Sequence, residues 1–404
     1  MTRRPMIGIG AVAVAVAILL GYALAPQGPL KGGPSAGPSQ ADAQPTATVR
    51  PTVRPIPGHE VFGFVPYWEM NGDIAADVAK TDLTTLALFS VTHTNDGSLD
   101  TTKLGYTRMT GDIGTRLIHE AHGRGVRVQL VYSSFGTARN ERLFASAAVQ
   151  DKVIGALVAL VKKTGVDGID VDVEQLDAGL VPAYGAFVGR LRDALRAAIP
   201  AGEVSVATAS GPTGAAMALA ATTAGADRVF LMAYDYHYAG SDPGASAPLA
   251  RRDGAPESLP WSLDLYGALG VPVSRTILGL PLYGMRWRVA GPELGAPRLG
   301  NGAIWVPADN PKFLANPPTP PELDPIEVVQ FYAVAPTVSP VPGDSRATAG
   351  WQAIYVDSPE TLAPKLALAD DRGLAGAGFW AIGYVRGITG YTDLITRFAS
   401  GKLQ

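Results

Sequence analysis

The sequence predicts an α/β fold, a (β/α)8 TIM barrel with a small inserted subdomain between strands 7 and 8. Two observations support this fold class. First, short β-rich runs alternate with helical patterns from about residue 60, and eight such units over roughly 340 residues suit a closed parallel barrel. Second, the last two runs are too far apart for one crossover helix. The runs are Val61–Pro66, Thr85–Val91, Val126–Tyr132, Gly168–Glu174, Val204–Ala209, Arg228–Tyr234, Thr276–Pro281 and Ala375–Ala381.

Helical patterns lie between most of these runs. In Ala147–Thr164, apolar residues recur at three- and four-residue spacing, and Gly165 follows as a stop signal. Pro182–Ala198 ends with several arginines, which suit the C-terminal half of a helix. A doubly wound open sheet is the alternative fold. It would normally carry a glycine-rich phosphate-binding turn after an early strand, and none follows Val61–Pro66.

Residues about 288–350 are predicted to form the insertion. They hold many prolines, including those within Pro317–Pro321, and a β-like run at Glu327–Ala333. We interpret this stretch as a subdomain or an elaborate loop at the mouth of the barrel. The barrel domain as a whole is predicted to span residues 58–402.

The composition excludes several classes of function. The chain has 404 residues, with 33 Lys+Arg, 36 Asp+Glu and a formal net charge of −3, so it lacks the basic surface expected of a nucleic-acid-binding protein. Its 47% hydrophobic residues are enough for a large core. The absence of cysteine excludes disulfides, thiolate catalysis and cysteine metal sites. We expect no nucleic-acid partner.

The N-terminus predicts export. Arg3 and Arg4 precede Ile7–Ala25, an uncharged and mostly apolar run that is long enough to span a bilayer. The run ends in a small-x-small cleavage site, but Pro26 disfavours cleavage directly before it. Residues 1–25 are therefore either a signal peptide or a retained signal anchor, which would contact the membrane.

A linker is predicted at residues 26–57. This segment is rich in proline and alanine and has almost no large apolar side chain, so it cannot offset its ordering entropy by burial. By the positive-inside rule, everything after the apolar run lies outside the cytoplasm. We expect an extracellular domain, either secreted or tethered to the outer face of the cytoplasmic membrane.

The most informative segment is Asp167–Glu174, which reads DGIDVDVE. Alternate side chains of a strand face opposite sides, so Asp170, Asp172 and Glu174 would share the inner face of the barrel. Burial and mutual repulsion both oppose ionisation of such a row, which keeps a proton available near neutral pH. Glu174 comes last, at the C-terminal rim where barrel enzymes carry out their chemistry.

Two other interpretations of the acidic strand are a solvated edge and a divalent-cation site. Strict alternation with β-branched residues argues against a solvated edge. Rows of Asp and Glu do bind Mg²⁺ or Ca²⁺, but no further clustered acidic or histidine ligands support that site here.

The same segment matches the DxxDxDxE signature of family 18 glycoside hydrolases, the chitinase family. The resemblance extends from about residue 60 to residue 400. The family often inserts a small α+β subdomain between strands seven and eight. Further segments that resemble family motifs are Phe62–Phe64, Pro66–Trp68, Leu231–Asp235, Leu278–Gly284 and Gly378–Trp380.

The resemblance implies a role for each catalytic side chain. Glu174 would protonate the glycosidic oxygen while the substrate's own 2-acetamido oxygen attacks the anomeric carbon, a substrate-assisted retaining mechanism. Asp172 would orient the acetamide N–H and stabilise the positive charge, and Asp170 would share a proton with Asp172. Tyr234 would donate a hydrogen bond to the acetamide carbonyl. No metal ion and no cofactor is implied.

The resemblance also suggests sugar-binding residues. Met232 and Asp235 would shape the acetamide pocket, and Trp380 would offer its ring face to the sugar bound there. Further along the cleft we expect sugar contacts from four aromatic side chains, of which the tryptophans follow strand ends. These are Tyr67, Trp68, Tyr283 and Trp287.

Some positions depart from the family pattern or invite another interpretation. In Ser133–Gly136, Phe135 stands where the family often has glycine, and Phe64 replaces a tyrosine that many chitinases have. His119–His122 has the wrong spacing for a zinc helix, so a solvated helix end is the better interpretation. His237 is a candidate for the cleft wall. For Trp305 and Trp351, we expect core packing.

These observations predict an exported family 18 glycosidase that cleaves β-1,4-linked N-acetylglucosamine polymers, with chitin and chito-oligosaccharides as the first expectation. A peptidoglycan-active N-acetylglucosaminidase is the close alternative. A catalytically silent sugar-binding protein is the third, although silent relatives commonly lose the terminal glutamate and Glu174 is present. We expect a monomer whose partner is the polysaccharide.

Overall fold

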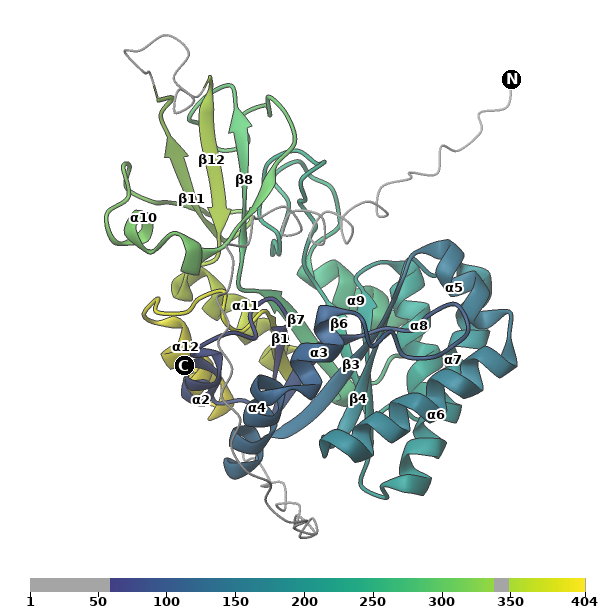
Figure 1. The fold of residues 1–404 in the computed structure, drawn as a ribbon. Helices are drawn as coiled ribbons and strands as arrows, with labels where there is room; N and C mark the ends of the chain where they lie inside the picture. Colours follow the sequence, from purple (N-terminus) through teal and green to yellow (C-terminus); the bar gives the residue numbers. More distant parts are fainter. Residues whose placement is uncertain (1–58, 338–348, 404) are drawn as a thin grey trace, which may run out of the picture.

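The computed structural model describes residues 59–337 and 349–403, and these residues form the predicted barrel with its insertion (Figure 1). The parallel strands close in the order β1-β13-β7-β6-β5-β4-β3-β2, so the expected TIM barrel is confirmed. The barrel strands are β1 (Glu60–Pro66), β2 (Thr85–Val91), β3 (Arg127–Phe135), β4 (Gly168–Glu174), β5 (Glu203–Ala209), β6 (Arg228–Met232), β7 (Thr276–Pro281) and β13 (Gly376–Trp380).

Helices surround the barrel and connect its strands. They are α2 (Ile74–Lys80), α3 (Leu104–Thr110), α4 (Asp112–Gly123), α5 (Thr137–Phe144), α6 (Ala147–Thr164), α7 (Val181–Ala198), α8 (Pro212–Thr223), α9 (Leu259–Leu269), α11 (Pro359–Asp371) and α12 (Tyr391–Ala399). The bounds of α6 are those predicted, because the Ser146 side chain caps its N-terminus at Val149 N–H and Gly165 ends it with a φ of 76°.

The insertion lies between β7 and β13, as predicted, and builds a separate sheet, which Figure 1 shows at the top of the view. Its strand order is β10-β11-β12-β8-β9, and all its pairings are antiparallel. Its elements are β8 (Gly284–Val289), β9 (Ala303–Trp305), α10 (Pro311–Ala315), β10 (Glu322–Asp324), β11 (Val329–Val334) and β12 (Trp351–Val356).

Three barrel strands end elsewhere than the sequence predicted, among them β13, which ends at Trp380 instead of Ala381. Strand β3 continues to Phe135, where it pairs with Glu174 of β4. Strand β6 ends at Met232 instead of Tyr234, and Asp235 adopts a positive φ of 62°. A non-glycine residue rarely adopts this conformation, and it turns the chain out of the sheet. The side chains of Tyr234 and Asp235 therefore point in other directions than they would if β6 continued through them.

Charged side chains fill the N-terminal end of the barrel. The Glu60 carboxylate accepts hydrogen bonds from Arg127 at 3.1 Å and from Arg228 Nε at 2.7 Å. Arg127 also donates to Glu203 at 3.0 Å. Strands β1, β3 and β6 are not neighbours in the closed sheet, so these bonds cross the barrel interior.

Aromatic rings fill the next part of the interior. The rings of Phe62 and Phe64 on β1 lie 5.6 Å and 4.8 Å from the ring of Phe230 on β6. The barrel is thus a packed core rather than a pore, as is usual for eight strands. Because side chains alternate along a strand, these rings show which positions of β1 and β6 face the barrel interior. The positions of neighbouring strands that are in register with these rings also face inward.

The predicted signal segment, residues 1–25, and the predicted linker, residues 26–57, lie outside the described residues. Within residues 59–337 and 349–403, no single helix is both long and apolar enough to cross a membrane. Among the same described residues, the helices α5 and α6 reach that length and apolar character when they are taken together across a bend of 97°.

Candidate active site

The three predicted acids lie together on the inner face of β4. Asp170 accepts a hydrogen bond of 2.6 Å from Ser205, its register partner on β5. Ser205 lies two residues after Glu203, whose side chain belongs to the charged interior, so Asp170 faces inward. Asp170 is fully buried and Asp172 is 3% exposed, while Glu174 at the strand end is partly exposed.

The acid row has few partners for its oxygens. Within the described residues, Asp170 Oδ2 and Asp172 Oδ1 are buried without a hydrogen-bond partner. A buried carboxylate without partners strongly resists ionisation, because its charge cannot be solvated. The geometry therefore favours a row that holds protons at neutral pH.

The pKa values follow from this burial. Burial raises the pKa of Asp170 to about 7, and the Ser205 hydroxyl offsets only part of the shift. Burial, followed by the charges of Glu174 and Asp170, raises the pKa of Asp172 well above its ordinary range. Burial and then the charge of Asp235 raise the pKa of Glu174 to about 7. Such a glutamic acid can donate a proton near neutral pH.

The end of β6 brings Tyr234 and Asp235 to the acid row. Asp235 accepts a hydrogen bond from the Tyr283 hydroxyl at 2.5 Å and one from Ser246 at 3.3 Å. Burial raises the pKa of Asp235 to about 6, against the effect of these two donors. Burial and the charge of Asp172 raise the pKa of Tyr234, so this phenol remains a hydrogen-bond donor. Met232 precedes them on the inward face of β6 and is partly exposed.

Aromatic side chains form the wall beside the acids. Trp380, at the end of β13, is 9% exposed and packs against Phe64 at 5.5 Å and Phe89 at 4.9 Å between ring centroids. Trp68 lies edge-on to Trp380 at 6.2 Å and donates its indole N–H to the Tyr384 hydroxyl. Tyr67 and Trp68 are both partly exposed.

Trp287 does not lie on this wall. It is 1% exposed and packs edge-on against Tyr355 at 5.9 Å, inside the insertion. Its neighbours Arg286 and Arg288 are exposed, so the two-residue period of β8 turns the indole inward. The expectation of a sugar platform at Trp287 is therefore wrong. Tyr283 is 2% exposed and reaches the site through its hydroxyl contact with Asp235, not as an open ring face.

The histidine candidates have structural surroundings. His119 is exposed, and His122 contacts Asp167 at 2.7 Å. In the part of the chain that the structure describes, no group of three or more His, Cys, Asp or Glu side chains is arranged to hold a metal ion. His237 is 2% exposed and contacts Glu327 of the insertion at 3.2 Å, so it does not line the cleft.

The tryptophans assigned to core packing lie in or against the cores. Trp305 is 5% exposed and belongs to a small cluster in the insertion with Tyr332, Ile354 and Val356. Trp351 is partly buried against the main core.

Three supporting residues were not predicted. Ser205 could have been inferred, since it alternates with buried valines on β5. Asn140 donates to the backbone carbonyl of Glu174 at 2.6 Å and fixes the end of β4. Ser246 contacts Asp235 through both its donor and acceptor functions, although eleven residues separate them. No local pattern marks Asn140 or Ser246, because both act through tertiary contacts.

Comparisons with known proteins agree with the fold. Residues 61–384 match the model of the glycosyl hydrolases family 18. A probable endochitinase of Caenorhabditis elegans is 27% identical over 267 residues, which are 62% of this chain and 42% of that protein. The chain spans between 34% and 42% of the length of the curated relatives it matches.

Solved structures with the same fold include a chitinase and a cortex-lytic enzyme. A class V chitinase from Nicotiana tobaccum, solved in complex with NAG4, superposes with a TM-score of 0.71 at 16% identity and covers 85% of this chain and 99% of that one. The spore cortex-lytic enzyme SleL of Bacillus cereus superposes with a TM-score of 0.67 at 17% identity and covers 85% and 75% of the two chains.

Proposed function

The chain belongs to the glycosyl hydrolases family 18, and from this premise we propose that it is an exported glycosidase that cleaves β-1,4-linked N-acetylglucosamine polymers, chitin or chito-oligosaccharides. One observation carries the proposal. Glu174 ends an inward row of acids at the C-terminal rim of the barrel, and its pKa is raised to about 7. This is the position and the protonation state that a general acid requires.

The neighbouring acids support a substrate-assisted reaction. Glu174 donates its proton to the glycosidic oxygen as the bond to the anomeric carbon breaks. The 2-acetamido oxygen of the substrate forms the new bond to that carbon, which gives an oxazolinium intermediate, and water then opens it with overall retention. Asp172 faces the acetamide N–H and stabilises the positive charge, while Asp170 exchanges a proton with it.

The remaining side chains orient the sugar. Tyr234 donates its hydroxyl hydrogen to the acetamide carbonyl, which aims the oxygen at the anomeric carbon. Met232 and Asp235 shape the pocket around the acetamide, and Trp380 faces the ring of the same sugar. Tyr67 and Trp68 are partly exposed, as contacts to further sugar units require.

A second candidate is hydrolysis at N-acetylglucosamine in peptidoglycan. The similarity to SleL favours it, since SleL is a spore cortex-lytic enzyme with this fold. Both polymers present a 2-acetamido group, so the proposed mechanism acts on either.

Incubation of the full chain with chitotetraose and with purified peptidoglycan, followed by mass spectrometry of the products, tests the proposal. The E174Q variant should lose about 10²–10⁴-fold in kcat while it still binds sugar. E141Q, which changes an exposed glutamate on α5, is the matched control and should hydrolyse like wild type. De-N-acetylated oligomers should not be cleaved, because they lack the attacking oxygen.

Different products distinguish the candidates. N-acetylated oligomers released only from peptidoglycan would select the second candidate. Sugar binding without hydrolysis of either polymer would refute the enzymatic proposal and indicate a lectin. N-terminal mass analysis of the protein recovered from the medium or from membranes tests export separately.

A further inference from the structure

The loop between β6 and α9, residues 233–258, carries Asp235 and is held from two sides. On the barrel side, the backbone N–H of Asp235 donates to Ser246 Oγ at 3.0 Å, and the Ser246 carbonyl accepts from Tyr236 N–H at 3.0 Å. Ser246 thus fixes both the backbone and the carboxylate of Asp235. Ser246 and the Tyr283 hydroxyl together therefore hold the Asp235 carboxylate in place.

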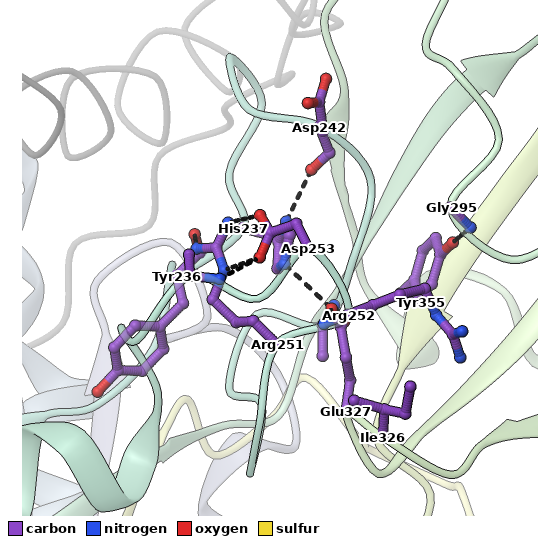
Figure 2. Close-up of polar contacts among 12 residues, drawn as sticks. Tyr236, His237, Asp242, Arg251, Arg252, Asp253, Gly295, Ile326, Glu327 and Tyr355 are labelled. Carbon is purple, nitrogen blue, oxygen red and sulfur yellow. Dashed lines mark hydrogen bonds and ion pairs between the residues drawn. The ribbon is translucent and has the colours of Figure 1, made fainter.

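On the other side, Glu327 of the insertion enters the same loop. It lies between β10 and β11 and is 1% exposed. Its Oε2 accepts a hydrogen bond of 2.6 Å from the backbone N–H of Ala245, the residue before Ser246. Its Oε1 accepts one of 3.1 Å from Arg252 N–H and lies 3.2 Å from His237 Nε2 (Figure 2).

The turn that presents Glu327 is itself fixed. Asp324 accepts hydrogen bonds from the backbone N–H groups of Ile326 and Glu327. The Arg252 guanidinium binds the same carboxylate through Nε at 3.1 Å and Nη2 at 2.7 Å. The loop and the insertion thus hold each other through a bidentate pair and a buried carboxylate, both of which are geometrically demanding contacts.

The loop contributes further contacts that fix His237 and Arg251. His237 Nδ1 lies 2.8 Å from the Asp242 carbonyl, and Arg251 donates to Asp253 and to the Tyr236 carbonyl, as Figure 2 shows. Charged and titratable groups surround Glu327 from the loop, from the insertion and from α11: His237, Arg251, Arg252, Asp324, Tyr355 and Lys365.

We propose that Glu327 is a positioning residue for the hydrolytic site, which acts through Ala245 and Ser246 to hold Asp235 beside Glu174. This inference deepens the proposed function and rests on it. The insertion then has a role in catalysis. Its Glu327 carboxylate fixes the loop that carries Asp235, and the charge of Asp235 acts on Glu174.

The proposal makes a specific kinetic prediction. The Asp235 charge contributes to the raised pKa of Glu174, so a displaced or less ionised Asp235 lowers that pKa. Because Glu174 must be protonated to act, the alkaline limb of the kcat profile should then move to lower pH. A merely structural role of Glu327 would reduce the amount of folded enzyme and leave the profile where it is.

Four variants of the full chain test this, with chitotetraose or whichever polymer the wild type cleaves. E327Q keeps the shape of Glu327 but turns an N–H₂ group toward one of its donors. S246A removes the contact with Asp235, E327Q/S246A combines both changes, and E322Q alters an exposed glutamate of the same insertion as the control. Thermal unfolding of each variant shows that it is folded at the assay temperature.

E327Q should lower kcat about 10-fold with little change in KM, within the roughly 100-fold that a displacement of about 1 Å can cost. E327Q and S246A should each move the alkaline limb down by about half a pH unit. The double variant should lose no more than the more affected single variant, because both act on one contact chain. E322Q should match wild type.

If the wild type is active and folded E327Q has the same pH profile as the wild type, the inference is overturned but the proposed function stands. An inactive wild type instead refutes the proposed function. Additive losses in the double variant also overturn the inference. If E327Q does not fold at the assay temperature, E327D takes its place, because it keeps the carboxylate on a side chain one methylene shorter. Its alkaline limb should move to lower pH as well, and an unchanged pH profile of E327D would also overturn the inference.

Discussion

Replacing Asp170 with asparagine should stabilise the folded chain, and the gain should depend on pH. Burial raises the pKa of Asp170 from 3.8 to about 7. In the unfolded chain this carboxyl ionises near its ordinary value, whereas in the folded chain it stays protonated until about pH 7. The stability associated with the protonated group is therefore fully present below pH 3.8 and is lost as the pH rises to 7.

The magnitude follows from the size of the pKa shift. One pKa unit corresponds to about 1.4 kcal/mol, so the shift at Asp170 lowers the free energy of unfolding by up to about 4 kcal/mol above pH 7. Asparagine keeps a carbonyl oxygen for the Ser205 hydroxyl but adds an N–H₂ group, so we expect about half of this as the net gain. For about 330 folded residues, roughly 2 kcal/mol raises the unfolding temperature by about 3 °C.

Calorimetric unfolding of wild type and D170N between pH 4 and pH 8 measures this difference. The unfolding temperatures should separate progressively up to pH 7 and stay separated by a constant amount above it. D82N, which removes an exposed carboxylate, should follow the wild type throughout. Parallel curves for D170N and wild type would refute the reasoning, since they would mean that Asp170 ionises alike in the folded and unfolded chains.

Three further predictions concern the site. The kcat of wild type should fall as the pH rises through about 7, because Glu174 loses the proton that it donates; a pH–rate profile that is flat to pH 9 would contradict this. Y283F removes a donor that favours ionised Asp235, so Asp235 carries less charge and the alkaline limb should move to lower pH in the same assay. W68A should raise KM for oligosaccharides by up to about 10-fold through lost ring contact, whereas W287F should leave KM unchanged and lower the unfolding temperature by removing buried volume; equal effects on KM would show that the burial argument fails.

The barrel and its acid row could be predicted because they follow local rules. The period of two along Gly168–Glu174 assigns Asp170, Asp172 and Glu174 to one face, and the structure confirms that they share it. Helix α6 was predicted with its bounds because its apolar spacing and its terminal glycine are sequence signals. Such features need only neighbouring residues to be inferred.

Apart from the contact of Ser205, the contacts that support the site could not be predicted, because residues far apart in the sequence form them. Ser246 contacts Asp235 only because the loop folds back, and Glu327 reaches Ala245 across 82 residues. The error at Trp287 has a similar origin. A position just past a barrel strand suggested the cleft wall, but the chain enters a second sheet there, whose register turns the ring inward.

Carboxyl groups lie at both ends of the barrel, but they have different partners at the two ends. Toward the N-terminal end, Glu60 and Glu203 are paired with arginines. The rings of Phe62, Phe64 and Phe230 occupy the interior beyond that charged end. Among the described residues, burial and neighbouring carboxylates raise the pKa values of the acid row, and the Ser205 hydroxyl lowers that of Asp170. No cation among these residues contributes to the pKa shifts. An arginine beside the row would fix Glu174 as a carboxylate and remove its proton, so the separation of the two ends is a condition for acid catalysis at neutral pH.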